Sequence, residues 1–316
     1  MVLKKSIANL GLLFGLLCLV SLGNKASACT DGKDHDGILP KNNLKVSTSF
    51  FRAGETMTEE TFNKIIDGVM KLYVPIVKEQ GGNLIVQRLW KDETVNAYAS
   101  QTGTAWQVSM FGGLARHPAI TEDGFALVVC HEIGHHIGGY PKKKSMWGSS
   151  SWASNEGQSD YFGSSKCLKR YFKAQKNSQA VVAKKAVPEE VQNKCFAAWG
   201  QTPDHALCVR VALAGQSLGN LFAALGRSAK PDFAKPDTSV VAGMNDNHPA
   251  SQCRLDTYFS GGLCTKSIDE NMTNNSETAG ACATSEGYKI GARPLCWFKP
   301  KTVKAGSKLV KKLAMK

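Results

Sequence analysis

Beyond its first 28 residues, this chain of 316 residues lacks an apolar run long enough to cross a membrane. A transmembrane helix needs about 20 apolar residues in succession, whereas the longest later candidate, 206–225, is interrupted by Arg210, Gln216 and Asn220. That segment predicts a buried or amphipathic helix. We therefore expect the chain after residue 28 to be soluble, with one sizeable core.

Residues 1–28 have the pattern of a secretory signal, in which two lysines precede an apolar stretch and small residues end at Ala28. We expect cleavage after Ala28 and a periplasmic or secreted protein. Lipid anchoring at Cys29 is the less favoured alternative. Lipoprotein sites prefer a leucine-like residue three positions before the cysteine, where this chain has Ala26.

The chain also lacks a CxxC pair, so its ten cysteines do not have the usual spacing of a structural zinc site. In an exported protein they are expected to form disulfides, chiefly in the second half of the chain. Cys130, which lies among apolar residues, is expected to be a small buried residue instead. The cysteines of the second half are Cys167, Cys195, Cys208, Cys253, Cys264, Cys282 and Cys296.

Acidic residues are few relative to basic ones, and the formal net charge of +13 favours anionic partners. The excess is greatest in residues 299–316, which contain seven lysines and no acidic residue. This tail lacks arginine and aromatic residues, so nucleic acid is not an expected partner. We expect a solvated tail, with weak contact to an anionic envelope surface as the alternative.

The strongest functional signal is the sequence His-Glu-Ile-Gly-His-His at 131–136. On a helix, His131 and His135 lie one turn apart on one face, so both can bind one Zn²⁺ with Glu132 beside its open position. Zinc lowers the pKa of bound water, and Glu132 can accept the proton as the water attacks a carbonyl. The flanking residues predict a helix that begins after Thr121 and ends at Gly138.

A catalytic zinc site usually has three protein ligands. The position six residues after His135 is Pro141, which cannot bind. Downstream, Glu156 and Asp160 lie four residues apart, on one face of an expected second helix. Glu156 is the expected third ligand, and Asp160 the acceptor that orients a ligand imidazole, His131. The alternative is a solvated acidic helix edge.

Together with Asn96-Ala97-Tyr98 and the later NEGQSD, the HEIGH motif resembles the gluzincin metallopeptidases grouped with HtpX and the CAAX prenyl endopeptidases. The resemblance covers residues 58–172. It implies that an edge strand follows the Asn-Ala-aromatic stretch, here 104–110, and that the glutamate of ExxxD binds zinc. Many relatives span the membrane several times, and this chain has no such segments, so prenyl-protein processing is a poor inference.

Family members also carry a late His-Pro element with an arginine a few residues on. The stretch from His248-Pro249 to Arg254 is similar. By this resemblance His248 lies near the metal, where it stabilises the oxyanion or caps the zinc in a resting state. His136 points about 100° away from His135 on a helical wheel and is expected to be a packing or surface residue.

We expect an α+β fold, mainly helical, with a gluzincin-like zinc-protease core, a small sheet and a disulfide-pinned helical and irregular C-terminal part. The pattern predicts helices at 58–79, 189–199 and 205–225, a strand at 83–90, and a flexible loop at 138–153. The expected parts are a signal peptide (1–28), an N-terminal extension (29–57), a metallopeptidase core (58–172), a basic linker (173–190), a cysteine-rich part packing on the core (191–298) and a basic tail (299–316).

These features favour a secreted or periplasmic endopeptidase with one zinc ion per chain, acting by zinc-activated water with Glu132 as general base and His248 steadying the oxyanion. Its expected partners are protein or peptide substrates, among them misfolded envelope proteins. A non-catalytic envelope chaperone or binding protein with a retained zinc site is the alternative. A third hypothesis keeps the hydrolase chemistry but acts on cell-wall peptides.

Overall fold

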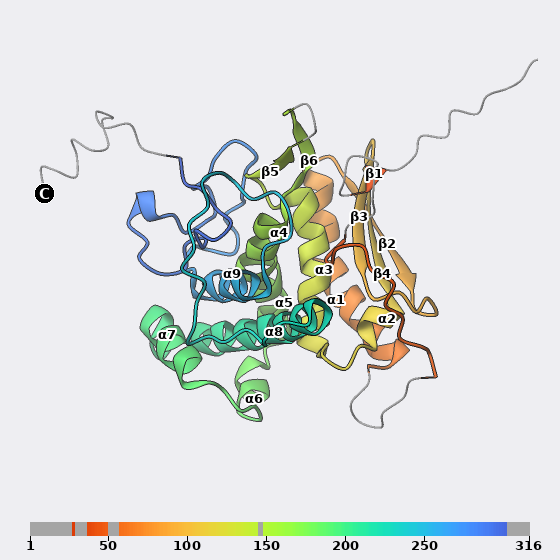
Figure 1. Ribbon diagram of the computed structural model, residues 1–316, viewed down its shortest axis with the longest axis horizontal. Coiled ribbons are helices and arrows are strands. Elements are labelled where there is room, and N and C mark those ends of the chain that lie inside the picture. The colour runs from red at the N-terminus through yellow and green to blue at the C-terminus, as the bar shows by residue number, and fades with distance from the viewer. Residues whose placement is uncertain (1–26, 29–36, 50–56, 145–147, 302–316) are drawn as a thin grey trace, which may run out of the picture.

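The structure is a computed structural model, and it describes residues 27–28, 37–49, 57–144 and 148–301. Helices predominate over two small sheets, as expected for a mainly helical α+β fold. Helix α3 (Glu122–Ile137) runs through the centre, with the larger sheet on one side and helices α4 and α9 on the other (Figure 1). The expected signal peptide up to residue 26 and the tail from residue 302 lie outside the described residues.

Local signals in the sequence account for helix α3. The Thr121 hydroxyl accepts a hydrogen bond from the backbone N–H of Gly124 at 3.0 Å, which caps the first turn. Acidic side chains lie in that turn, where the helix dipole favours them, and the helix ends at Gly138. Every residue from Gly124 to Ile137 is buried, so the predicted helix is confirmed as a core element.

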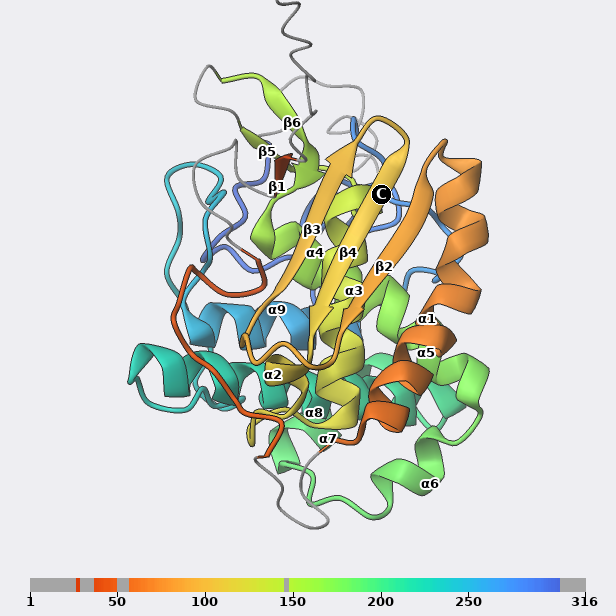
Figure 2. The same ribbon diagram turned by 90° about the vertical axis from the view of Figure 1, so that its right-hand side faces the viewer.

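Helix α1 (Glu59–Glu79) begins after Thr58 and lies beside the four-stranded sheet. The strand order is β1-β3-β4-β2, and Figure 2 shows this sheet lying across α3. β2 and β4 are parallel, whereas β3 is antiparallel to both β4 and β1. The strands are β1 (Ser27–Ala28), β2 (Asn83–Leu89), β3 (Ala97–Thr102) and β4 (Ala105–Phe111).

The prediction that 104–110 forms an edge strand is wrong. The strand that forms there, β4, lies inside the sheet, because a tight turn at Gly103 (φ +57°) pairs it with β3 while β2 pairs along its other side. The stretch Asn96-Ala97-Tyr98 itself leads into β3, whose outer side pairs with only the two residues of β1 among the described strands.

The flexible loop predicted at 138–153 is wrong in part, because β5 (Lys142–Lys144) and β6 (Ser150–Ser154) pair there as antiparallel strands. The Lys142 ammonium group donates to the Trp152 carbonyl oxygen at 2.8 Å and ties the two strands together. Directly after β6, α4 (Glu156–Phe162) continues through the π-helix η1 (Gly163–Cys167) into α5 (Leu168–Gln175). The predicted second helix is therefore confirmed.

The C-terminal half adds further helices around this centre. Of the described helices, only α8 is long and apolar enough to span a membrane, and 83% of its apolar window is buried within the protein. Of the two alternatives expected for 206–225, a buried or an amphipathic helix, the structure shows the buried one. The other elements are α2 (Gly112–Ala115), α6 (Ser178–Val182), α7 (Glu189–Trp199), α8 (Pro203–Gly226), α9 (Ser251–Leu263) and the 3-10 helix η2 (Thr284–Glu286).

Four disulfides join the described cysteines, consistent with an oxidising compartment. The expectation that Cys130 is a free buried residue is wrong, because it bonds to Cys167 and ties α3 to η1. The apolar sequence neighbours of Cys130 gave no sign of this bond, because its partner lies 37 residues later on the neighbouring helix. The remaining pairs lie within the second half, as predicted: Cys195–Cys208, Cys253–Cys296 and Cys264–Cys282.

Candidate active site

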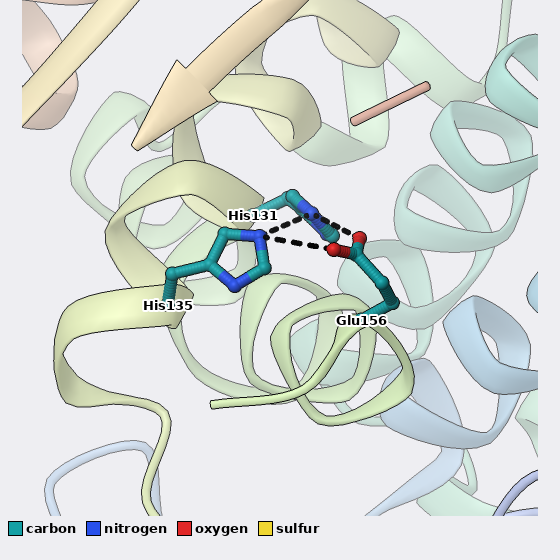
Figure 3. A group of neighbouring side chains, drawn as sticks. All are labelled: His131, His135 and Glu156. Atoms are coloured by element: carbon teal, nitrogen blue, oxygen red, sulfur yellow. Dashed lines mark hydrogen bonds and ion pairs between the residues drawn. The ribbon is translucent and has the colours of Figure 1, made fainter. Parts of the chain in front are cut away.

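Helices α3 and α4 bring His131, His135 and Glu156 together in the centre of the protein (Figure 3). The Nε2 atoms of the two histidines are 3.1 Å apart. The Glu156 Oε2 atom lies 3.3 Å from the His131 Nε2, and Oε1 lies 3.8 Å from the His135 Nε2. All three side chains are fully buried, so this group could hold a metal ion.

The donor atoms fit a divalent cation. Four ligands about 2.1 Å from a tetrahedral zinc ion lie roughly 3.4 Å from one another, and the three observed separations bracket this value. Both carboxylate oxygens of Glu156 are buried without a hydrogen bond among the described residues. Burying a carboxylate without hydrogen bonds costs free energy. A cation held between Glu156 and the two imidazoles would offset that cost.

Asp160 orients His131. Its Oδ1 atom accepts a hydrogen bond from the His131 Nδ1 at 2.7 Å, which leaves the Nε2 lone pair directed at the candidate metal position. Two further groups hold Asp160 in place: the Arg254 guanidinium binds both carboxylate oxygens at 2.7 and 2.8 Å, and the Tyr258 hydroxyl donates to Oδ1 at 2.7 Å. All of these side chains are buried.

This network fixes the charge of the site. Burial lowers the pKa of His131, but the charge and hydrogen bond of Asp160, together with nearby Glu156 and Glu132, raise it to about 9. The negative surroundings of this imidazole therefore attract positive charge, which a bound metal ion would supply in place of the proton. Burial raises the pKa of Asp160, but the charge of Arg254 lowers it by more. The net pKa lies below the usual value, so this carboxyl stays ionised.

Neutral groups hold His135. Its Nδ1 donates to the Ser154 carbonyl oxygen at 2.8 Å, and the Ser159 hydroxyl lies 3.0 Å from the same nitrogen. This arrangement also leaves Nε2 free to bind a metal. Burial lowers the pKa of His135 to about 3, and the neighbouring Glu156 does not reverse the shift, so its imidazole is neutral.

Glu132 follows His131 on the helix and is fully buried. Neither of its carboxylate oxygens has a hydrogen bond among the described residues. Burial raises the pKa of Glu132 to about 8, close to neutrality, and the nearby Glu156 adds to that effect. An unpaired carboxyl with a pKa near the working pH is suited to accept and then donate a proton.

Two further groups approach Glu156 from outside the pair of helices. The His248 Nε2 lies 3.4 Å from its Oε2, and the Lys143 Nζ lies 3.9 Å from its Oε1. Burial raises the pKa of Glu156, but the neighbouring His248 and His131 hold it well below the usual value. His248 therefore lies beside an oxygen of the candidate ligand Glu156.

His136 does not join the site. Its ring stacks between the side chains of Trp106 and Trp152, with centroids 5.5 and 4.9 Å away, and its Nε2 donates to the Gln107 carbonyl oxygen at 3.2 Å. Burial lowers its pKa to about 4, which keeps it neutral. The expectation of a packing residue is confirmed, and the ring closes the gap between the sheet and the hairpin.

Sequence reasoning missed Ser159, Tyr258 and Lys143, and it noted Arg254 only for its place after a His-Pro pair. The role of Arg254 could have been anticipated in part, because a buried aspartate needs a cationic partner, and Arg254 on α9 is that partner for Asp160. Ser159 lies between Glu156 and Asp160, on the turn that faces α3. The other two reach the site only through the fold.

Comparisons with protein-family models, with curated protein sequences and with solved structures find no match to this chain.

Proposed function

We propose that this protein is a zinc-dependent endopeptidase of the gluzincin kind. The observation that carries the proposal is the convergence of two imidazoles and a carboxylate, all buried, with a second unpaired carboxyl from Glu132 beside them. A purely structural zinc site needs no such base. The four disulfides support an oxidising compartment. The chain is then secreted or periplasmic, and cleavage after Ala28 would remove the two residues of β1.

A bound zinc ion, one per chain and held by His131, His135 and Glu156, would polarise a peptide carbonyl and a water molecule. Glu132 takes a proton from the attacking water and passes it to the departing amide nitrogen. His248 donates a hydrogen bond to the oxygen that becomes negative as the carbonyl carbon turns tetrahedral. Asp160 fixes the ring of His131 throughout.

The substrates we propose are proteins or peptides of the cell envelope, including misfolded ones. Cell-wall peptides share the same amide chemistry and are the second substrate class to test. The basic tail at 299–316, described only as far as residue 301, would add weak attraction to an anionic surface. Deleting it is expected to reduce envelope partitioning at low salt if that attraction exists.

Glu132→Gln is the decisive variant. It should keep one zinc ion per chain by metal analysis, yet hydrolyse casein at least about 100-fold more slowly, because the amide cannot accept the proton. Glu122→Gln, an exposed residue of the same helix, is the matched control and should behave as the wild type. Full casein hydrolysis by Glu132→Gln would overturn the mechanism.

One observation favours a non-catalytic zinc protein instead. His248 lies close enough to Glu156 to serve as a fourth donor, which would close the coordination sphere. In that case X-ray absorption of the zinc protein should show four protein ligands, and no unfolded protein should be turned over. An open position and casein hydrolysis would exclude this alternative.

A further inference from the structure

The chain's own N-terminal segment lies across the candidate active site. The stretch from Gly37 onward passes between β3 and α9 before it reaches α1 (Figure 2). The Gly37 carbonyl oxygen accepts a hydrogen bond from the His248 Nε2 at 2.8 Å. The same histidine lies 3.4 Å from Glu156, so this carbonyl group lies beside the candidate metal ligands.

The peptide group that follows is held just as closely. The backbone N–H of Ile38 donates to the Ala97 carbonyl oxygen of β3 at 3.1 Å and lies near the Glu132 carboxyl. The Ile38 carbonyl oxygen accepts from the Arg254 Nη1 at 2.6 Å. Arg254 thus contacts both this segment and Asp160.

Asn96 binds the next residue in both directions. Its amide oxygen accepts from the Leu39 backbone N–H, and its amide nitrogen donates to the Leu39 carbonyl oxygen, each at 3.1 Å. Ile38 and Leu39 are 0% and 1% exposed, so both side chains fill apolar space. Only glycine fits before them, because a methyl group at Gly37 would overlap the Ala97 carbonyl oxygen.

These are the contacts that a peptide needs when it is hydrolysed here. The carbonyl of the bond to be cut must face the oxyanion donor, and its amide nitrogen must face the proton carrier. At the Gly37–Ile38 bond, His248 meets the carbonyl oxygen, and Glu132 lies near the nitrogen. The residues after the bond are bound through their backbone groups, in a bend that the Gly37 N–H closes by donating to the Leu39 carbonyl oxygen at 3.2 Å.

We propose that residues 37–39 occupy the substrate subsites of this site, and that the Gly37–Ile38 bond is a self-processing site. This inference rests on the proposed function. Hydrolysis breaks the bond between the Gly37 carbonyl carbon and the Ile38 nitrogen. The hydroxyl of water joins that carbon, and the remaining proton of water passes through Glu132 to the nitrogen, which becomes a new N-terminus.

The occupied subsites also define a substrate class. They accept a residue without a side chain before the bond and branched aliphatic residues at the two positions after it. Arg254 and Asn96 bind backbone groups of Ile38 and Leu39, within a continuing chain, which suits an endopeptidase. Before processing the site is sealed, since the metal-binding side chains and Glu132 are fully buried.

The first test uses the purified full chain with one equivalent of zinc, followed over time by intact mass and N-terminal sequencing. Wild type and the exposed control Asn43→Ala should both accumulate a chain that begins at Ile38. Glu132→Gln and the chelated wild type should not. Gly37→Ala should slow cleavage at this bond at least about tenfold, because the added methyl group displaces the carbonyl from its place.

A second test works in trans and does not depend on how a variant folds. The processed wild type should cut a blocked synthetic peptide with Gly-Ile-Leu at its centre between glycine and isoleucine, at least about tenfold faster than a matched Gly-Asp-Leu peptide. Casein serves as the general substrate in parallel.

The outcomes separate the two proposals. If casein is hydrolysed while the Gly37–Ile38 bond stays intact and the Gly-Ile-Leu peptide is not preferred, the self-processing site is overturned and the endopeptidase stands. If neither the zinc-loaded wild type nor a chain that begins at Ile38 hydrolyses casein or peptide, the proposed function fails as well.

Discussion

Buried cations are handled differently in two regions of this protein. At the candidate site, Arg254 is paired with a carboxylate, that of Asp160, through two hydrogen bonds. At the end of α9 and just after it, backbone carbonyl oxygens bind buried cations instead: Cys264 binds Lys169 of α5, and Ser267 binds Lys166 of η1. Arg293 likewise binds the Tyr140 and Glu277 carbonyl oxygens, and it also binds the Gln158 side chain.

The pKa values follow this division. Burial lowers the pKa of Arg254, but Asp160 more than reverses the effect and raises it. Burial lowers the pKa of Lys169 to about 7 and that of Lys166 to about 8, because the nearby carboxylates, Asp204 and Glu270 respectively, offset the loss of water only in part. Charge pairing thus orients a ligand imidazole, whereas the lysines satisfy carbonyl groups of an irregular segment that helices and strands do not satisfy.

The largest expected effect is from Arg254→Met. It leaves Asp160 buried without its cation, and breaking such a pair destabilises a protein by about 3 to 5 kcal/mol. Urea unfolding of the chelated protein measures this change. The exposed pair Arg88–Asp67 provides the control, because Arg88→Met should lower the free energy of unfolding by less than about 1 kcal/mol. Equal losses in the two variants would mean that burial does not strengthen the dependence of Asp160 on its cation.

Lys169 tests the other region, where the pKa of a buried cation is lowered instead of raised. Its pKa is depressed in the folded state, so the unfolded chain binds more protons between about pH 7 and its ordinary pKa of 10.4. Stability should therefore rise with pH through that window, and Lys169→Met should remove on the order of 2 to 3 kcal/mol of this rise.

Thermal unfolding at pH 7, 8 and 9 compares wild type with Lys169→Met and with Lys173→Met, an exposed lysine of the same helix. The control should keep the wild-type dependence on pH. An unchanged slope in Lys169→Met would mean that the amine is protonated in the fold, and the contrast with Arg254 would then be one of geometry alone.

The sequence predicted what depends on neighbours along the chain. The Thr121 cap and the glycines after Ile137 bound helix α3, and the spacing of Glu156 and Asp160 indicated one helix face. It could not predict pairing across long distances. Arg254 meets Asp160 across 94 residues, and His248 meets Gly37 across 211. The edge of the sheet was misplaced for the same reason, because strand order depends on which distant strand pairs with β4.

Within the site, Asp160→Asn tests the charged support of His131. An amide can still accept the hydrogen bond, but it does not favour positive charge at the metal position, so zinc affinity should fall about 10- to 100-fold. Competition with a chelating dye measures it. Tyr258→Phe, which keeps the carboxylate and removes one hydrogen bond, should change the affinity less than about threefold. Equal affinity in Asp160→Asn and wild type would contradict the role given to this charge.

The smallest effect is expected from Ser159→Ala, on the neutral side of the site. His135 keeps its hydrogen bond to the Ser154 carbonyl oxygen, so the ring should stay in place, and a net loss of about 1 kcal/mol, near fivefold in zinc affinity, is the upper bound. The same dye titration decides it. A loss as large as that of Asp160→Asn would show that a hydroxyl supports its ligand as strongly as a paired carboxylate does. The charge on the His131 side would then serve the folding of the core more than the binding of the metal.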